Sequence, residues 1–226
     1  MNNPEDSAEM DTSTPNRAKT IQSPYDYAAA LGTVTATGKC LYGPRFSIAD
    51  EDRPVILKLL CWFLMDEAVA EHEGIDLHKG ILLSGPVGCG KTAIMNIMRR
   101  ICDPQRAFLL RPCVQIALEF AGEGYDVINR YTARSFNMYT QVPRTVCLDD
   151  LGLEGNVPWY GAMCNTMAEI LLLRYDLFME QGMLTHATTN LNSAGLEERY
   201  GNRIRSRMRQ MFNLIAFPQT GTDKRT

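Results

Sequence analysis

Short apolar segments recur along the chain and are separated by longer amphipathic stretches. There are five of them, at residues 80–84, 107–111, 145–149, 183–188 and 213–217. Their apolar positions are continuous rather than alternating, which is typical of strands buried on both faces of a parallel sheet. Because helical periodicity fills the stretches between them, the pattern predicts a series of β–α–β units with right-handed crossovers. We therefore expect an α/β domain.

Three of the amphipathic stretches carry a pronounced helical pattern. Residues 54–71 place apolar side chains at helical spacing after Pro54, which fits the first turn of a helix. Residues 159–180 have a similar apolar stripe. Arg174 falls on that stripe, so this cation must pair, extend to solvent or lie at a subunit interface. Residues 114–141 predict two helices, the second of which is rich in Tyr and Arg.

This Tyr- and Arg-rich part allows two interpretations. Aromatic and basic side chains on one helix can hold single-stranded nucleic acid by stacking and charge. The same spacing also fits an ordinary amphipathic helix whose arginines are solvated. The residues concerned are Tyr125, Arg130, Tyr131, Arg134, Phe136 and Tyr139.

The two ends of the chain have a different character. Residues 1–23 are rich in Asn, Ser, Thr, Pro and Asp, and this composition predicts disorder. Residues 24–45 carry three tyrosines and three glycines, and they predict either a loosely packed arm or a segment that docks on a partner. We therefore expect a flexible, partly disordered arm over 1–45, a folded domain over 46–217 and a tail over 218–226.

Composition narrows the class of protein. The chain has 226 residues, of which 45% are hydrophobic, and a formal net charge of −3. Its pI is near 5.7. This balance excludes a globally basic nucleic-acid-binding protein, although it leaves a local basic face open. The apolar stretches are far shorter than a membrane span, and residues 1–20 lack the apolar core of a secretory signal.

The cysteines and histidines indicate no metal centre. The seven cysteines are scattered without a Cys-x-x-Cys pair, and most lie in apolar segments, where a reduced thiol acts as a small apolar side chain. The three histidines do not cluster at ligand spacing. We expect reduced thiols, a cytoplasmic protein and no structural metal.

A glycine-rich sequence follows the first apolar segment and precedes a helical one. Strand, glycine-rich turn and helix are the context of a phosphate-binding loop, because the glycines let backbone N–H groups face an anion at the positive end of the helix. Lys91 can then contact the β- and γ-phosphates of a nucleoside triphosphate, and the Thr92 hydroxyl can bind Mg²⁺. The predicted loop consists of Gly85, Pro86, Val87, Gly88, Cys89, Gly90, Lys91 and Thr92.

Polar residues at two later strand ends are candidates for the same site. The third apolar segment ends in Asp149 and Asp150. We predict that Asp149 holds Mg²⁺ with Thr92, and that Asp150 orients and polarises the attacking water. Many ATPases have Glu at the second position, whose arm is longer. Asn190 follows the fourth segment, where an amide can hydrogen-bond the γ-phosphate or the lytic water.

Residues 199–209 are unusually basic, with five arginines in eleven positions. Gly201 predicts a break between two helices. Arg203 and Arg207 then lie four apart on a common helical face. This spacing predicts an arginine finger, which would neutralise transition-state charge in the site of a neighbouring subunit. The other arginines of the second helix are expected to be solvated or to face DNA.

Together these motifs resemble the AAA+ ATPase core of the DnaC and DnaI helicase loaders and the IstB transposition helpers. The resemblance rests on residues 85–92, 145–152, 188–192 and 199–209 in that order, and it covers roughly residues 50–217. It implies a P-loop α/β fold with a five-stranded parallel sheet in the order 5-1-4-3-2, flanked by helices. Only nine residues follow Phe217, so we expect no C-terminal lid domain.

The resemblance also implies a function. We expect an accessory ATPase that hydrolyses ATP with Mg²⁺ and assembles on single-stranded DNA with a replicative helicase or a transposase. It would act in DNA replication or in transposition of a mobile element. The resemblance further implies a homo-oligomer in which Arg203 or Arg207 acts in trans. A nucleotide-gated binding module with marginal hydrolysis is the alternative, and a phosphotransferase for a small molecule is a third interpretation.

Overall fold

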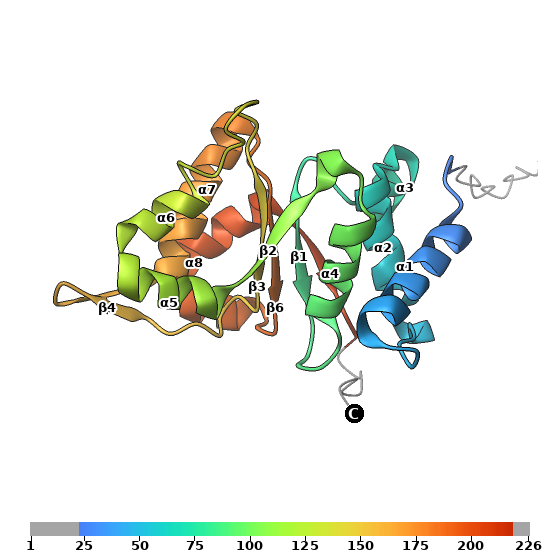
Figure 1. Ribbon diagram of the computed structural model, residues 1–226, viewed down its shortest axis with the longest axis horizontal. Helices are drawn as coiled ribbons and strands as arrows, with labels where there is room; N and C mark the ends of the chain where they lie inside the picture. The colour runs from blue at the N-terminus through green and yellow to red at the C-terminus, as the bar shows by residue number, and fades with distance from the viewer. Residues whose placement is uncertain (1–22, 219–226) are drawn as a thin grey trace, which may run out of the picture.

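The chain folds around a five-stranded parallel sheet (Figure 1), in a computed structural model that describes residues 23–218. The strand order is β2-β3-β6-β1-β7. These strands are β1 (Gly80–Ser84), β2 (Phe108–Pro112), β3 (Thr145–Asp149), β6 (Thr185–Thr189) and β7 (Phe212–Ala216). The predicted order 5-1-4-3-2 is therefore confirmed. Each predicted strand also lies within two residues of the observed one.

Strand β1 lies inside the sheet and is covered on both faces. It pairs in parallel with β6 and β7, and Leu82 lies opposite Ala187 and Leu214. Ile81 and Leu83 belong to the apolar core on one face of the sheet, and Leu82 belongs to the core on the other face. Its continuous apolar pattern follows from this double burial.

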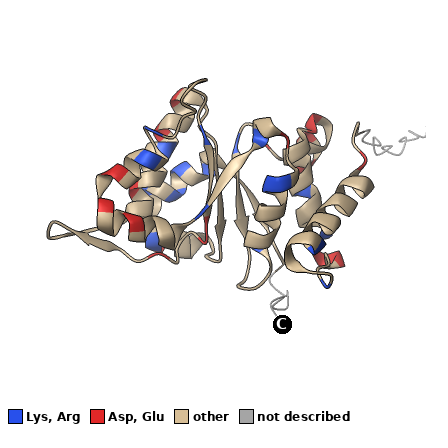
Figure 2. Ribbon diagram, in the orientation of Figure 1, with Lys and Arg blue, Asp and Glu red and all other residues tan. Residues whose placement is uncertain are grey.

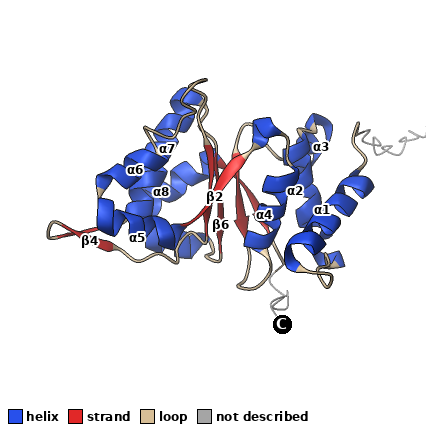
Figure 3. Ribbon diagram, viewed as in Figure 1, coloured by secondary structure: helices blue, strands red, loops and turns tan. Residues whose placement is uncertain are grey.

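Helices cover both faces of the sheet in two layers (Figures 1 and 3). Among the described residues, none of them is long and apolar enough to cross a membrane. One layer contains α1 (Tyr27–Tyr42), α2 (Arg53–Leu64), α3 (Glu67–Glu73) and α4 (Lys91–Ile101), with the short helices η1 (Asp50–Asp52) and η2 (Pro104–Arg106) beside it. The other contains α5 (Cys113–Glu123), α6 (Tyr125–Tyr131), α7 (Thr166–Gln181) and α8 (Ser193–Met211).

The N-terminal segment differs from the loosely packed arm that its sequence predicts. Residues 27–42 form the helix α1, which packs against α4 and α2. The Asp26 carboxylate caps it by accepting two backbone N–H groups at 3.0 Å. Val34 is fully buried, and Gly38 leaves room for the ring of Phe46. Only Val34 and Gly38 are buried on α1, and Thr, Gly and Lys interrupt its other apolar positions, so its helical pattern is weak. Residues 1–22 and 219–226 lie outside the described part.

Two other helices are shorter than predicted. The helix expected over 54–71 is divided at Met65, whose φ of 59° is left-handed. The Asp66 side chain then starts α3 by accepting the Val69 N–H group at 3.1 Å. Likewise, the helix expected over 159–180 begins only at Thr166.

Residues 157–164 instead form an antiparallel hairpin of β4 (Val157–Trp159) and β5 (Ala162–Cys164). Gly161, with a φ of 81°, lies in its turn. The ring of Trp159 packs against the ring of Phe120 on α5, at 5.4 Å between centroids. The hairpin projects from the domain beside α5 (Figure 1). Its apolar residues continue the helical stripe of α7 in sequence, and the prediction therefore extended the helix across them.

Arg174 neither reaches solvent nor lies at an interface, which corrects two of the sequence-based interpretations. Its side chain is completely buried on α7. It donates hydrogen bonds to the Thr185 hydroxyl and to the Tyr131 and Leu184 carbonyl oxygens, each at 2.7 Å, and to the Arg144 carbonyl oxygen at 3.2 Å. Burial lowers its pKa to about 9. Arg174 thus joins α7 to the end of α6, to β6 and to the loops beside them.

Two helices do form in residues 114–141, but the second, α6, ends at Tyr131, so Arg134, Phe136 and Tyr139 of the Tyr- and Arg-rich stretch lie outside it. The arginines of the stretch are also paired. Arg130 forms ion pairs with Glu119 and Glu123 on α5. Arg134 pairs with Asp126, and Tyr131 is buried. Acidic and basic residues are interspersed over these helices (Figure 2). The structure therefore favours an amphipathic helix over a nucleic-acid grip for α6.

Candidate functional site

The loop of residues 85–92 connects β1 to α4. Gly88 and Gly90 have φ values of 82° and 95°, a left-handed conformation that favours glycine. Gly85 lies so close to Phe217 that a Cβ atom there would come 2.8 Å from the Phe217 Cβ atom. Gly90 directly precedes α4. The loop therefore surrounds the positive N-terminal end of a helix, which favours an anion.

The Lys91 side chain folds back into this loop. Its ammonium group donates hydrogen bonds to the carbonyl oxygens of Gly85 and Pro86, both at 2.9 Å. The residue is only 5% exposed. The ammonium group therefore lies within the loop, where phosphate oxygens would be strong acceptors for it.

Thr92 and Asp149 are brought together from distant parts of the sequence. The Thr92 hydroxyl donates a hydrogen bond of 3.0 Å to Oδ1 of Asp149, the last residue of β3. Hydroxyl and carboxylate oxygens fit Mg²⁺, which binds few protein ligands and completes its shell with phosphate oxygens and water. The described residues contain no group of three His, Cys, Asp or Glu side chains that could hold a metal ion without such help.

Burial raises the pKa of the Asp149 carboxyl group. The residue is 3% exposed, and the loss of hydration disfavours its charged form. The charge of Asp150 raises the pKa further. Hydrogen bonds from Thr188 and Thr92 and the charge of Lys91 oppose the rise. A cation bound beside Asp149 would favour the ionised form.

Thr188 is a site residue to which the sequence assigned no role. Its hydroxyl donates a hydrogen bond of 2.7 Å to Oδ1 of Asp149 and accepts one of 2.8 Å from the Asp150 N–H group. Its carbonyl oxygen accepts the Leu151 N–H group at 2.8 Å. The signal was the hydroxyl pair before Asn190 at the end of a buried strand. Thr188 fixes the backbone on which both acids lie.

Asp150 and Asn190 lie at neighbouring strand ends, as predicted. Asp150 follows β3 directly and has a φ of 55°, which Asp tolerates better than most residues. Asn190 follows β6, the strand between β1 and β3. Thr189, just before it, accepts the Gly85 N–H group at its carbonyl oxygen and donates its hydroxyl to the Leu151 carbonyl. Asp150 and Asn190 are both partly exposed at this edge.

The candidate finger arginines lie elsewhere, on α8 in the layer opposite α4 (Figure 1). The helix is broken at Gly201, as predicted, with φ 82° and ψ 161°. Arg203 and Arg207 line an open depression of about 520 Å³ on the surface of α7 and α8. The Arg207 guanidinium lies 4.7 Å from the ring centroid of Tyr175 and 3.9 Å from the Asp176 carboxylate. Arg203 is exposed.

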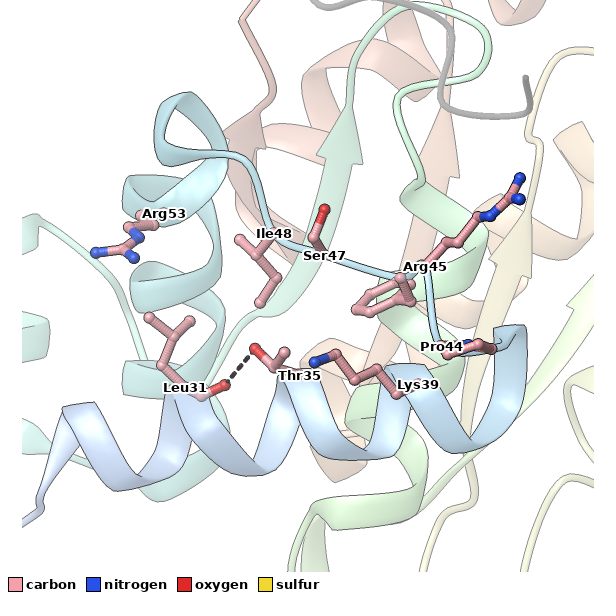
Figure 4. Close-up of a pocket in the computed structure, with 9 residues that line it drawn as sticks. Leu31, Thr35, Lys39, Pro44, Arg45, Ser47, Ile48 and Arg53 are labelled. Carbon is pink, nitrogen blue, oxygen red and sulfur yellow. Dashed lines mark hydrogen bonds between the residues drawn. The ribbon is translucent and has the colours of Figure 1, made fainter.

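A second depression, of about 310 Å³, lies between α1 and residues 44–53 (Figure 4). Lys39 and Arg45 contribute positive charge to its wall. Arg53, also in the wall, is paired with Asp50. The residues of the phosphate loop and of the acidic strand end do not line it.

No protein-family model matches the sequence, and no curated protein matches it. Solved structures do match in fold. A DnaC helicase loader aligns with a TM-score of 0.50 and 16% identity, covering 76% of this chain and 93% of the loader. A DNA replication initiation factor aligns with a TM-score of 0.50 and 15% identity, covering 80% of this chain and 50% of the factor. DnaI aligns with a TM-score of 0.49 and 19% identity, covering 76% of this chain and 88% of DnaI.

The chain has the P-loop AAA+ fold. The resemblance to DnaC-type helicase loaders, predicted from four motifs, is thus confirmed at the level of the fold. The AAA+ strand order also explains the grouping at the site. It places β6 between β1 and β3, so that the ends of all three strands meet at one edge of the sheet.

Proposed function

We propose that this protein is an ATPase that binds ATP with Mg²⁺ at the loop of residues 85–92. The observation that supports this most directly is the 3.0 Å hydrogen bond between the Thr92 hydroxyl and the Asp149 carboxylate. It joins a phosphate-binding loop to an acidic strand end, and the hydroxyl and carboxylate oxygens that it brings together would hold Mg²⁺. The two groups are far apart in the sequence, and a glycine-rich turn that arose by chance would not need an acidic side chain beside it.

Each residue of the site then has a defined role. The backbone N–H groups of the loop and the Lys91 ammonium would hold the β- and γ-phosphates, and Thr92 and Asp149 would hold Mg²⁺. Asp150 orients and polarises a water molecule, whose oxygen bonds to the γ-phosphorus as the bond to the bridging β–γ oxygen breaks. Asn190 hydrogen-bonds the γ-phosphate or this water. The products are ADP and inorganic phosphate.

The arginines complete the site across a subunit interface. Arg203 and Arg207 project from α8, whereas the phosphate loop leads into α4 in the other layer. A second copy of the chain would supply one of them to the developing negative charge, a contribution of about 10³–10⁵ in rate. Arg174 has no part in this, because its guanidinium is fully buried and bonded within its own subunit.

The process served is proposed as DNA replication or transposition of a mobile element. The fold is shared with a DnaC helicase loader and a DNA replication initiation factor. We propose assembly on single-stranded DNA together with a helicase or a transposase. Because Arg130 of α6 and Arg134 just after it are both paired with acidic residues, we do not place the DNA contact on this stretch.

A nucleotide-gated binding module is the second candidate. The acid next to Asp149 is Asp150, whose side chain is one methylene shorter than the Glu of many ATPases. A poorly positioned water would leave ATP binding intact and make hydrolysis marginal. ATP would then switch assembly by binding alone.

ATP binding and turnover of the purified full chain test both candidates. Lys91→Ala should lower kcat/KM by about 10²-fold or more, because the phosphates lose a fixed cation. Lys39→Ala, which removes an ammonium group from the other depression, is the matched control and should leave turnover unchanged. Turnover that rises with single-stranded DNA supports the accessory ATPase. ATP binding without turnover supports the binding module, and a wild-type chain that does not bind ATP refutes both.

A further inference from the structure

Glu154 is a buried carboxylate to which the proposed mechanism assigns no role. It lies in the loop after β3, and its side chain is 0% exposed. A carboxylate removed from water is costly unless charged and hydrogen-bonding partners surround it. The partners of Glu154 come from two separate segments, and both of these are connected to the candidate site.

The first segment is the turn that starts at Asp150. The Gly152 N–H group donates a hydrogen bond of 2.8 Å to Oε2 of Glu154. Gly152 has a φ of 103°, and a Cβ atom there would come 2.4 Å from Cδ1 of Leu191. The Leu153 N–H group closes the turn on the Asp150 carbonyl oxygen at 3.1 Å. The Glu154 carboxylate therefore fixes the turn that carries the proposed water-orienting acid.

The second segment is the first half of α8. The Tyr200 hydroxyl donates a hydrogen bond to Oε1 of Glu154, and the Arg199 guanidinium donates one to the Glu154 carbonyl oxygen. Nε of Arg199 lies 3.8 Å from Oε1 and forms an ion pair with it. Tyr200 immediately precedes the break at Gly201, beyond which the helix carries Arg203.

We propose that Glu154 is a positioning residue that couples nucleotide occupancy of its own subunit's site to the arginines offered to the neighbouring subunit. One carboxylate is bonded to the Asp150 turn through one oxygen and to α8 through the other. A displacement of the turn when the γ-phosphate binds or leaves is then transmitted to Tyr200 and to the helix that follows. This inference rests on the proposed function, because it assumes ATP at residues 85–92.

Hydrogen–deuterium exchange of the full chain tests the coupling without requiring turnover. A nonhydrolysable ATP analogue with Mg²⁺ should slow exchange in wild-type residues 150–154 and 199–209. In Tyr200→Phe, the analogue should still slow exchange at residues 150–154. At residues 199–209 the factor by which it slows exchange should be about tenfold smaller than in the wild type, which is the scale of one hydrogen bond to a buried charged group. Glu154→Gln should act in the same direction, because an amide does not attract the Arg199 cation.

Tyr27→Phe is the matched control for Tyr200→Phe. It removes a tyrosine hydroxyl that donates to another buried carboxylate, that of Asp66 at 3.1 Å, in the opposite helical layer. Both segments of this variant should respond as in the wild type. A purely structural role for Glu154 would change exchange at 199–209 equally with and without the analogue.

Three results overturn the inference, and they differ in what they say of the proposed function. If the analogue binds but wild-type residues 199–209 do not respond, the coupling fails and nucleotide binding stands. The same holds if Tyr200→Phe and Glu154→Gln both respond as the wild type does. If the analogue does not bind to the wild type at all, both the proposed function and the coupling are refuted.

Discussion

The residue that determines the electrostatics of the candidate site is Asp149. Its carboxylate is nearly enclosed and accepts the hydroxyl groups of Thr92 and Thr188 on one oxygen. Two hydroxyl donors do not replace the hydration that a carboxylate loses on burial, and the pKa of Asp149 is raised accordingly. The arrangement suits a carboxylate that binds a cation, and it lowers the stability of the folded protein when no cation is bound.

Asp149→Asn should therefore stabilise the nucleotide-free protein at neutral pH. The folded state of the wild type binds the Asp149 proton more tightly than the unfolded state, where the pKa is near 3.8. Stability consequently falls as pH rises from that value through the raised pKa, and the penalty is full above it. The asparagine keeps the hydrogen-bond acceptor without the charge. We expect a gain on the order of 1 kcal/mol at pH 7.

Calorimetric Tm values against pH, with and without Mg²⁺ and ATP, measure this effect. The gap between variant and wild type should narrow as pH falls, and the stabilisation by Mg²⁺ and ATP should be lost in Asp149→Asn. Asp126→Asn, an exposed acid paired with Arg134, serves as the control and should show neither change. A nucleotide-free Asp149→Asn variant less stable than the wild type at pH 7 would contradict the argument.

At the scale of elements, Arg174 connects α7 to the strands and loops around it. Its guanidinium satisfies three backbone carbonyl oxygens and the Thr185 hydroxyl in a site without solvent. Arg174→Met preserves much of the volume and leaves those acceptors without donors. At about 1–3 kcal/mol for each buried unsatisfied group, unfolding free energy should fall by at least about 3 kcal/mol.

Chemical denaturation compares this variant with Arg205→Met. Arg205 bonds to Ser193 and Glu197 near the surface of α8, so its loss should cost less than about 1 kcal/mol. Arg174→Lys should also be strongly destabilised, because one ammonium group cannot reach all the acceptors that surround the planar guanidinium group. Equal losses for Arg174→Met and Arg205→Met would show that the buried network contributes little.

The elements that the sequence predicted are those whose burial is uniform. Strands covered on both faces have continuous apolar patterns, so their positions could be predicted, whereas their order followed from the resemblance carried by the four motifs. The helix α1 was missed because only Val34 and Gly38 of its sixteen residues are buried, and a glycine at a packed position, here against Phe46, gives no apolar signal. The loop of residues 85–92 and the pair Asp149 and Asp150 carry local signatures. The roles of Thr188 and Glu154 depend on contacts between distant segments, which no local pattern encodes.

At the scale of the whole molecule, the two layers separate the parts of the proposed site. The phosphate loop leads into α4 in one layer, and the depression with Arg203 and Arg207 lies on α7 and α8 in the other. With ATP at the proposed site, a subunit built in this way would offer a nucleotide on one side and cations on another. Repeated contact between such surfaces would be heterologous, so it would produce a ring or an open helical filament. Turnover should then rise with protein concentration.

Mixed assemblies decide whether an arginine acts in trans. Lys91→Ala subunits keep their arginines but lack a working phosphate loop, and Arg203→Ala or Arg207→Ala subunits have the reverse defect. If one of these arginines is the finger, its variant should lose about 10³-fold or more in turnover alone. Activity should reappear on mixing with Lys91→Ala, because a wild-type arginine then faces an intact loop at a fraction of the interfaces. The variant of the arginine that is not the finger should keep its turnover without any mixing. Arg205→Ala, on the same helix, is the control. A finger variant that stays inactive in every mixture, while co-assembly is shown by cross-linking, would place that arginine in its own subunit's chemistry or stability.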